Sequence, residues 1–145
     1  MKIYIDADGC PVVDITLQTA HRYDVQVIII CDTSHIFERK DATVITVDKG
    51  ADSADFRLAN LIGRNDLAVT QDYGLATMCL SKGAYVINQD GMEYTDKNID
   101  GLLLSRYTAK KIRRGGGRLK GPKKRAPEQD KSYLKTLCRI LDTKK

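Results

Sequence analysis

The hydrophobic pattern of the chain alternates between short β-favouring runs and longer segments with the spacing of a helix face. The β-favouring runs are rich in valine and isoleucine, and the most apolar ones are typical of parallel strands buried on both faces. We expect strands at Lys2 to Ile5, Val25 to Cys31, Thr43 to Val47, Leu67 to Thr70 and Ala84 to Ile87. The helical spacing predicts helices at Val12 to Tyr23, Ser53 to Ile62, Leu75 to Ser81, Ile99 to Ile112 and Glu128 to Leu141.

Strands that alternate with helices predict an α/β fold with a parallel sheet. We therefore expect about five mainly parallel strands flanked by helices, in a single domain that spans residues 1–145. Residues 1–95 would form the α/β core, and residues 96–145 a basic, helical C-terminal extension. Residues 113–127 are rich in glycine, lysine and arginine, which predicts a flexible loop within this extension.

The first expected strand ends in two aspartates, Asp6 and Asp8, which Gly9 and Pro11 follow. Ligands of open parallel sheets bind beyond the carboxyl ends of the strands, so both carboxylates are expected at such a crevice. Neighbouring carboxylates repel unless a proton or a cation lies between them, and their oxygen atoms suit Mg²⁺ or Mn²⁺. An equally open interpretation is structural, with Asp8 capping the next helix and Asp6 accepting bonds from backbone N–H groups.

Asp52, Asp55 and Asp72 occupy comparable positions. Asp52 and Asp55 stand near the start of the second expected helix, where acids also favour the helix dipole, and Asp72 follows an apolar strand. Because parallel strands end at one edge of a sheet, these acids are expected to crowd into one crevice, which is costly without cations. This predicts metal ligands at Asp6, Asp8, Asp52 and Asp72. The expected chemistry is metal-assisted phosphodiester hydrolysis, with Asp6, Asp52, Asp55 and Asp72 as catalytic candidates.

The composition is that of a soluble globular protein, since 42% of the 145 residues are apolar and 30% are charged. No apolar run approaches the roughly 20 residues of a membrane helix, and the first run is too short for a signal peptide. A cytoplasmic location is therefore expected. The four cysteines include no C-x-x-C pair, which argues against a zinc site or a redox pair.

The charge is distributed unevenly along the chain. From Gly101 to Lys145, 15 lysines and arginines face 3 acids, a net charge of +12, whereas residues 1–100 carry −7 and the whole chain +5. A basic block on an acidic body predicts a polyanionic partner, or else a solvated tail. If the partner is a nucleic acid, we expect it to bind through Arg113, Arg114, Arg118, Lys120, Lys123, Lys124 and Arg125.

Several motifs resemble those of the YaiI/YqxD family of uncharacterised bacterial proteins, in the family's order and from Met1 to about Leu141. They are Asp-Ala-Asp-Gly-Cys-Pro-Val from Asp6, Gly-Ala-Asp-Ser-Ala-Asp from Gly50, Val-Thr-Gln-Asp-Tyr-Gly-Leu-Ala from Val69, and Tyr-Thr-x-Lys-Asn-Ile-Asp from Tyr94. The family's fold is regarded as similar to PIN/NYN-type nuclease domains, which hold Mg²⁺ or Mn²⁺ on an aspartate cluster and cleave RNA. The resemblance implies Asp6, Asp52 or Asp55, and Asp72 as metal-site acids, with Asp8 adjacent.

Three functions remain open from the sequence. The first is a metal-dependent ribonuclease, and the second a non-catalytic RNA- or ribosome-binding protein on the same scaffold, for which the basic segment suffices. The third is a phosphatase of the haloacid-dehalogenase type, because Asp6 to Gly9 resembles its Asp-x-Asp-Gly-Thr opening. Against the third, Cys10 replaces the threonine, and Lys49 lies too close to Asp52 to complete the expected pattern.

Overall fold

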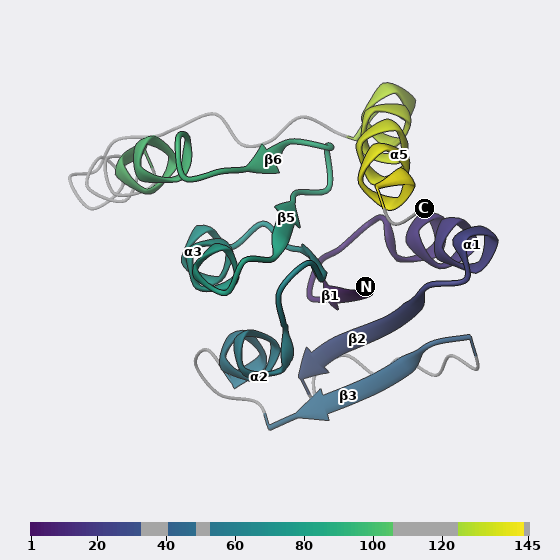
Figure 1. Cartoon of the computed structure of the whole chain (residues 1–145), viewed down its shortest axis with the longest axis horizontal. Helices are drawn as coiled ribbons and strands as arrows, with labels where there is room; N and C mark the ends of the chain where they lie inside the picture. The colour runs from purple at the N-terminus through teal and green to yellow at the C-terminus, as the bar shows by residue number, and fades with distance from the viewer. Residues whose placement is uncertain (33–40, 49–52, 106–124, 144–145) are drawn as a thin grey trace.

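The computed structural model describes residues 1–32, 41–48, 53–105 and 125–143 as a mixed α/β protein. Its strands are β1 (Lys2–Asp6), β2 (Gln26–Asp32), β3 (Thr43–Val47), β4 (Leu67–Val69), β5 (Tyr85–Ile87) and β6 (Glu93–Tyr94). Its helices are α1 (Val13–Tyr23), α2 (Ser53–Leu61), α3 (Tyr73–Ser81) and α5 (Pro127–Asp142), and residues 99–105 are helical too. The strands form one six-stranded sheet in the order β3-β2-β1-β4-β5-β6 (Figure 1). Neighbouring strands are parallel except β5 and β6.

The predicted fold class, an α/β protein with a mainly parallel sheet, is confirmed. All five predicted strands are present, and none of their ends shifts by more than one residue. The prediction that the strand ending at Ile87 is the last one is wrong, because β6 follows it and pairs with β5 in the antiparallel sense. β6 consists of Glu93 and Tyr94 alone, so it has no apolar run by which a strand could be predicted.

A capping side chain or a proline marks the first residues of two helices. α3 begins at Tyr73, earlier than the predicted Leu75, because the side chain of Asp72 caps it. α5 begins at Pro127, which the prediction had placed in the loop, and proline suits the first turn of a helix. Of the predicted helix up to Ile112, residues 99–105 are helical, and the rest of it lies outside the described residues together with residues 113–124 of the predicted loop.

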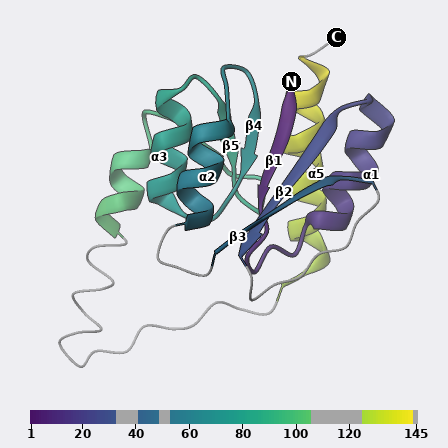
Figure 2. The ribbon, with the colours of Figure 1, turned by 90° about the horizontal axis from the view of Figure 1, so that it is seen from below.

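Alternate residues of each strand face opposite sides of the sheet and fill two separate cores. Ile3 and Ile5 pack on the side of α1 and α5, whereas Tyr4 packs on the side of α2 and α3. Figure 2 shows these two helical layers with the sheet between them. Because β1, β2 and β4 are covered on both faces, their sequences are nearly continuous apolar runs.

The strand order reverses direction beside β1. From β1 the chain runs outward through β2 to β3, and it then returns to β4 on the other side of β1. The segments that follow β1 and β4 lead to α1 and α3, which cover opposite faces of the sheet. Neighbouring segments that diverge in this way leave a crevice beyond the carboxyl ends of the strands, where open α/β sheets bind their ligands.

Candidate functional site

A cavity of about 410 Å³ lies at the carboxyl ends of β1, β2 and β4. Five aspartates line it: Asp6, Asp8, Asp32, Asp55 and Asp72. The other lining residues are Cys10, Ala54, Val69, Thr70, Gln71 and Gln89. Carboxylates that face one another across one cavity repel, so the site is electrostatically suited to a cation.

The parallel register of the strands explains why these acids meet. Ile5 pairs with Val69, so the next residues of the two strands, Asp6 and Thr70, also lie side by side. The hydroxyl of Thr70 donates a hydrogen bond of 2.9 Å to Oδ2 of Asp6. On the other side of β1, Asp6 pairs with Ile30, which brings Asp32 at the end of β2 to the same edge.

Thr70 connects two of the acidic segments. Its side chain is buried, with 3% of its surface exposed, and its oxygen also accepts a 3.0 Å bond from the backbone N–H of Asp72. The backbone N–H of Thr70 donates to the carbonyl of Ile87 on β5. One buried hydroxyl therefore ties the carboxylate of Asp6 to the backbone that carries Asp72.

Asp72 is the N-cap residue of α3. Its Oδ1 accepts bonds from the backbone N–H groups of Gly74, at 2.8 Å, and Leu75, at 3.1 Å. A capping role, which the sequence suggested for other aspartates such as Asp8, is thus found at Asp72. A side chain at position 74 would crowd this oxygen, because a Cβ on Gly74 would lie 3.2 Å from Oδ1.

The environment of Asp6 disfavours its negative charge. Burial raises the pKa of the Asp6 carboxyl, the bond from Thr70 opposes this shift, and the charges of Asp72 and Asp8 raise the pKa further. Burial also raises the pKa of the neighbouring Cys10 thiol, which argues against a thiolate nucleophile or ligand there. The charged groups of the site are therefore carboxylates, and a cation that offsets their repulsion would stabilise it.

The chemistry of the lining residues fits Mg²⁺ or Mn²⁺, which prefer carboxylate oxygens. Within the described ranges, no group of three or more histidine, cysteine, aspartate or glutamate side chains is arranged to hold a metal ion. Mg²⁺ does not need such a cage, because it usually keeps several waters and is bound through one or two carboxylates and substrate phosphates. Asp52, a further predicted ligand, lies outside the described residues.

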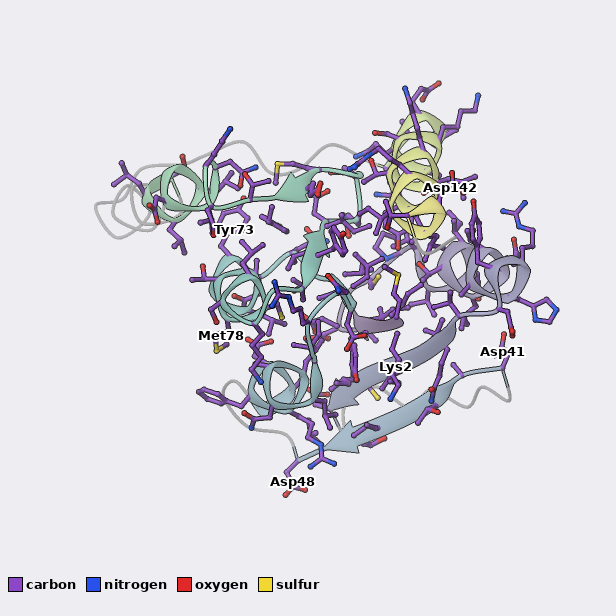
Figure 3. The ribbon with its side chains drawn as sticks, viewed as in Figure 1. Lys2, Asp41, Asp48, Tyr73, Met78 and Asp142 are labelled. Carbon is purple, nitrogen blue, oxygen red and sulfur yellow. The ribbon has the colours of Figure 1, made fainter. Side chains whose placement is uncertain are left out.

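Four of the five predicted acids therefore line one cavity, and the sequence prediction missed Asp32. The available signal was its position at the end of a buried apolar run, the same position that Asp6 occupies. Position after a strand is not sufficient, since Asp48 follows β3 and does not line the cavity. β3 is an edge strand, and Figure 3 shows Asp48 beyond its end, at the margin of the molecule.

The predicted nucleic-acid contacts from Arg113 to Lys124 lie outside the described residues, and Arg125 is held within the protein. Its guanidinium group forms ion pairs with Asp90, at 3.0 Å, and with Asp130, at 2.7 Å. It also donates a 2.8 Å bond to the backbone carbonyl of Gln89. Any contact of Arg125 with nucleic acid must compete with these bonds.

A family model described as "Uncharacterized BCR, YaiI/YqxD family" matches residues 4–143 of this chain. The chain belongs to the YaiI/YqxD family. Among curated relatives, a UPF0178 protein of Ruminiclostridium cellulolyticum is 51% identical over 141 residues, which cover 97% of this chain and 92% of that protein. A UPF0178 protein of Exiguobacterium sibiricum is 47% identical over 144 residues, or 99% of each chain.

One similar solved structure is the crystal structure of Rae1 (YacP) from Bacillus subtilis, a W164L mutant. It covers 100% of both chains with 16% sequence identity and a TM-score of 0.46, which is too distant a likeness to inform on activity. Among the described residues of this YaiI/YqxD family member, no helix combines the length and the apolar character needed to cross a membrane.

Proposed function

We propose that this chain is a Mg²⁺- or Mn²⁺-dependent nuclease that cleaves RNA. The observation that carries the proposal is the convergence of five aspartates on one cavity at the point where the strand order reverses. A single acid after a strand has an ordinary structural use, as Asp72 shows by capping α3. Five acids line this cavity, and one of them, Asp6, has a raised pKa. A bound cation explains this arrangement better than five separate structural roles do.

Each residue has a distinct role in this proposal. Asp6, Asp8 and Asp72 hold the ion, together with Asp52 or Asp55. When bound, the ion activates a water molecule and stabilises charge on the phosphoryl group. Thr70 fixes one oxygen of Asp6, so that the carboxylate keeps one orientation toward the cavity.

The acidic cavity cannot attract a polyanion by itself, and the basic segment supplies that attraction. The cations from Arg113 to Lys124 favour binding to a phosphate backbone through counterion release, so affinity should fall steeply as salt rises. Such contacts carry little sequence information. The resemblance to PIN/NYN-type nuclease domains favours RNA as the substrate.

A non-catalytic RNA-binding protein is the second candidate, and one observation favours it. The oxygen of Asp72 already has a structural use at the N-terminus of α3, which a protein without catalysis would also need. In this case the basic segment alone binds RNA, and the acids line the cavity without holding a metal.

The test is cleavage of a fluorescent single-stranded RNA by the purified protein with Mn²⁺, with Mn²⁺ plus EDTA, and after the Asp6→Asn substitution. We expect cleavage with Mn²⁺ alone and none from the variant. Asp100→Asn serves as the matched control, because Asp100 is an exposed acid that does not line the cavity.

Salt-dependent RNA binding without metal-dependent cleavage would favour the non-catalytic protein instead. Hydrolysis of a small phosphomonoester, without cleavage of RNA, would point to the phosphatase.

A further inference from the structure

Two glutamines from different segments meet at the margin of the acidic cavity. Gln71 lies in the segment between β4 and α3, Gln89 lies between β5 and β6, and both side chains line the cavity. The amide of Gln71 donates a hydrogen bond from Nε2 to Oε1 of Gln89. The cavity is otherwise lined by five carboxylates, among other residues. Unlike a carboxylate, an amide is uncharged and both donates and accepts hydrogen bonds.

The backbone that carries Gln89 is held by its own turn and by α5. Oδ1 of Asn88 accepts bonds of 2.9 Å from the backbone N–H groups of Asp90 and Met92. Arg125, which precedes α5, donates to the carbonyl of Gln89 at 2.8 Å and pairs with the carboxylate of Asp90. These bonds fix the backbone from which the side chain of Gln89 extends to the cavity.

Gly91 makes the close contact between this turn and α5 possible. Its φ of +85° is a conformation that side-chain-bearing residues rarely adopt, and a Cβ there would lie 2.5 Å from the carbonyl oxygen of Ser132. The carbonyl of Gly91 also accepts a 2.7 Å bond from the hydroxyl of Thr136 on α5. The position of Gln89 therefore depends on the C-terminal helix.

We propose that Gln71 and Gln89 form a base-recognition pair that binds an adenine next to the phosphate to be cleaved. This inference rests on the proposed nuclease function and names a feature of its substrate. In the proposed nuclease the carboxylates would hold the metal ion, which offsets the charge of the phosphate. A neutral amide instead suits the edge of a base. Unstacked bases of single-stranded RNA present these edges to proteins.

The chemistry of the amides favours adenine. While Oε1 of Gln89 accepts from Gln71, the amide of Gln71 keeps its own oxygen and a second N–H, and Gln89 keeps both of its N–H groups. An amide that offers an acceptor beside a donor matches the N6 amino group and the N7 atom of adenine, the bidentate pairing that glutamine makes with this base. Such a pair gives discrimination on the order of tenfold.

The first measurement maps cleavage positions in a random-sequence single-stranded RNA with Mn²⁺, for the wild type, Gln71→Ala and Gln89→Ala. We expect adenine to be enriched at one fixed position relative to the cut, and both substitutions to reduce this enrichment about tenfold. The enrichment is a ratio between positions within one sample, so it does not depend on the overall cleavage rate of a variant. Gln18→Ala is the matched control, since Gln18 is an exposed glutamine on α1 that does not line this cavity.

The second measurement is the binding of a labelled oligo(U) RNA, with and without one central adenosine, by fluorescence anisotropy. Stronger binding of the adenosine-containing RNA that both variants lose supports base recognition, even if the protein does not cleave. In that case the absence of cleavage overturns only the proposed nuclease activity. Cleavage with no adenine enrichment, or with an enrichment that both variants retain, overturns the base recognition and leaves the nuclease intact. Equal binding of both RNAs by a protein that does not cleave overturns the base recognition as well.

Discussion

Asp72 has two roles that different substitutions can separate: a cap of α3 and a proposed metal ligand. The cap requires only an oxygen that accepts bonds from the N–H groups of Gly74 and Leu75. Asparagine and serine provide such an oxygen, and alanine does not. The metal site requires a carboxylate, which none of the three replacements retains.

The expected magnitudes follow from this geometry. Asp72→Ala should lower the free energy of unfolding by about 1 kcal/mol relative to Asp72→Asn, which is the usual cost of losing an N-cap oxygen. In a chain of this size that cost lowers the melting temperature by roughly 2–4 °C. Because both variants lack the charge, their difference isolates the cap from the repulsion between Asp72 and Asp6.

The assay combines thermal unfolding, followed by circular dichroism in EDTA, with RNA cleavage in Mn²⁺ for all three variants. EDTA removes metal, which would otherwise stabilise the wild type selectively. We expect Asp72→Asn and Asp72→Ser to unfold near the wild-type temperature and Asp72→Ala below it, with cleavage lost in all three. If Asp72→Asn cleaves RNA like the wild type, Asp72 is only a cap. Equal stability of the alanine and asparagine variants would refute the cap.

Three further changes test other parts of the structure. The raised pKa of Asp6 means that the folded state retains a proton that the unfolded state releases, so stability should fall as pH rises from the ordinary aspartate pKa through the raised one. Asp6→Asn should flatten this fall in urea unfolding measured across that range, and an unchanged profile would contradict the pKa shift. Thr70→Val removes the hydroxyl between Asp6 and the backbone N–H of Asp72, which should cost about 1–3 kcal/mol in urea unfolding and most of the cleavage activity, whereas Thr70→Ser should retain both. Gly91→Ala should destabilise the fold by about 2–4 kcal/mol through backbone strain and the clash with α5. Gly101→Ala, where a Cβ has open space, should not destabilise it. Equal effects of the two substitutions in thermal unfolding would argue against the contact between Gly91 and α5.

The parallel strands could be predicted because burial on both faces leaves nearly continuous apolar runs in the sequence, as in Val27 to Cys31. β6 could not, because it consists of two residues whose pairing with β5 depends on the turn that α5 holds. Its single buried side chain, Tyr94, is indistinguishable in sequence from a tyrosine in a loop.

The site was predictable in part for a related reason. Asp6 and Asp72 follow short apolar strands, so topology alone brings them together. Asp32 was missed because the sequence after β2 is mostly polar, and only the pairing of β2 with β1 shows that Asp32 reaches the same edge. Other features depend on residues far apart in sequence, such as the ion pair between Arg125 and Asp90, and these could not be predicted from local patterns.

The most direct test of the central claim is titration of the metal-free protein with Mn²⁺ by calorimetry, for the wild type, Asp6→Asn and Asp100→Asn. If the carboxylates of the cavity hold a metal, the wild type and Asp100→Asn should bind Mn²⁺ with the same affinity and Asp6→Asn should bind it at least about tenfold more weakly, as expected when a ligand or its support is lost. Absence of binding by the wild type, or equal binding by all three proteins, would show that the acids of this cavity do not form a metal site.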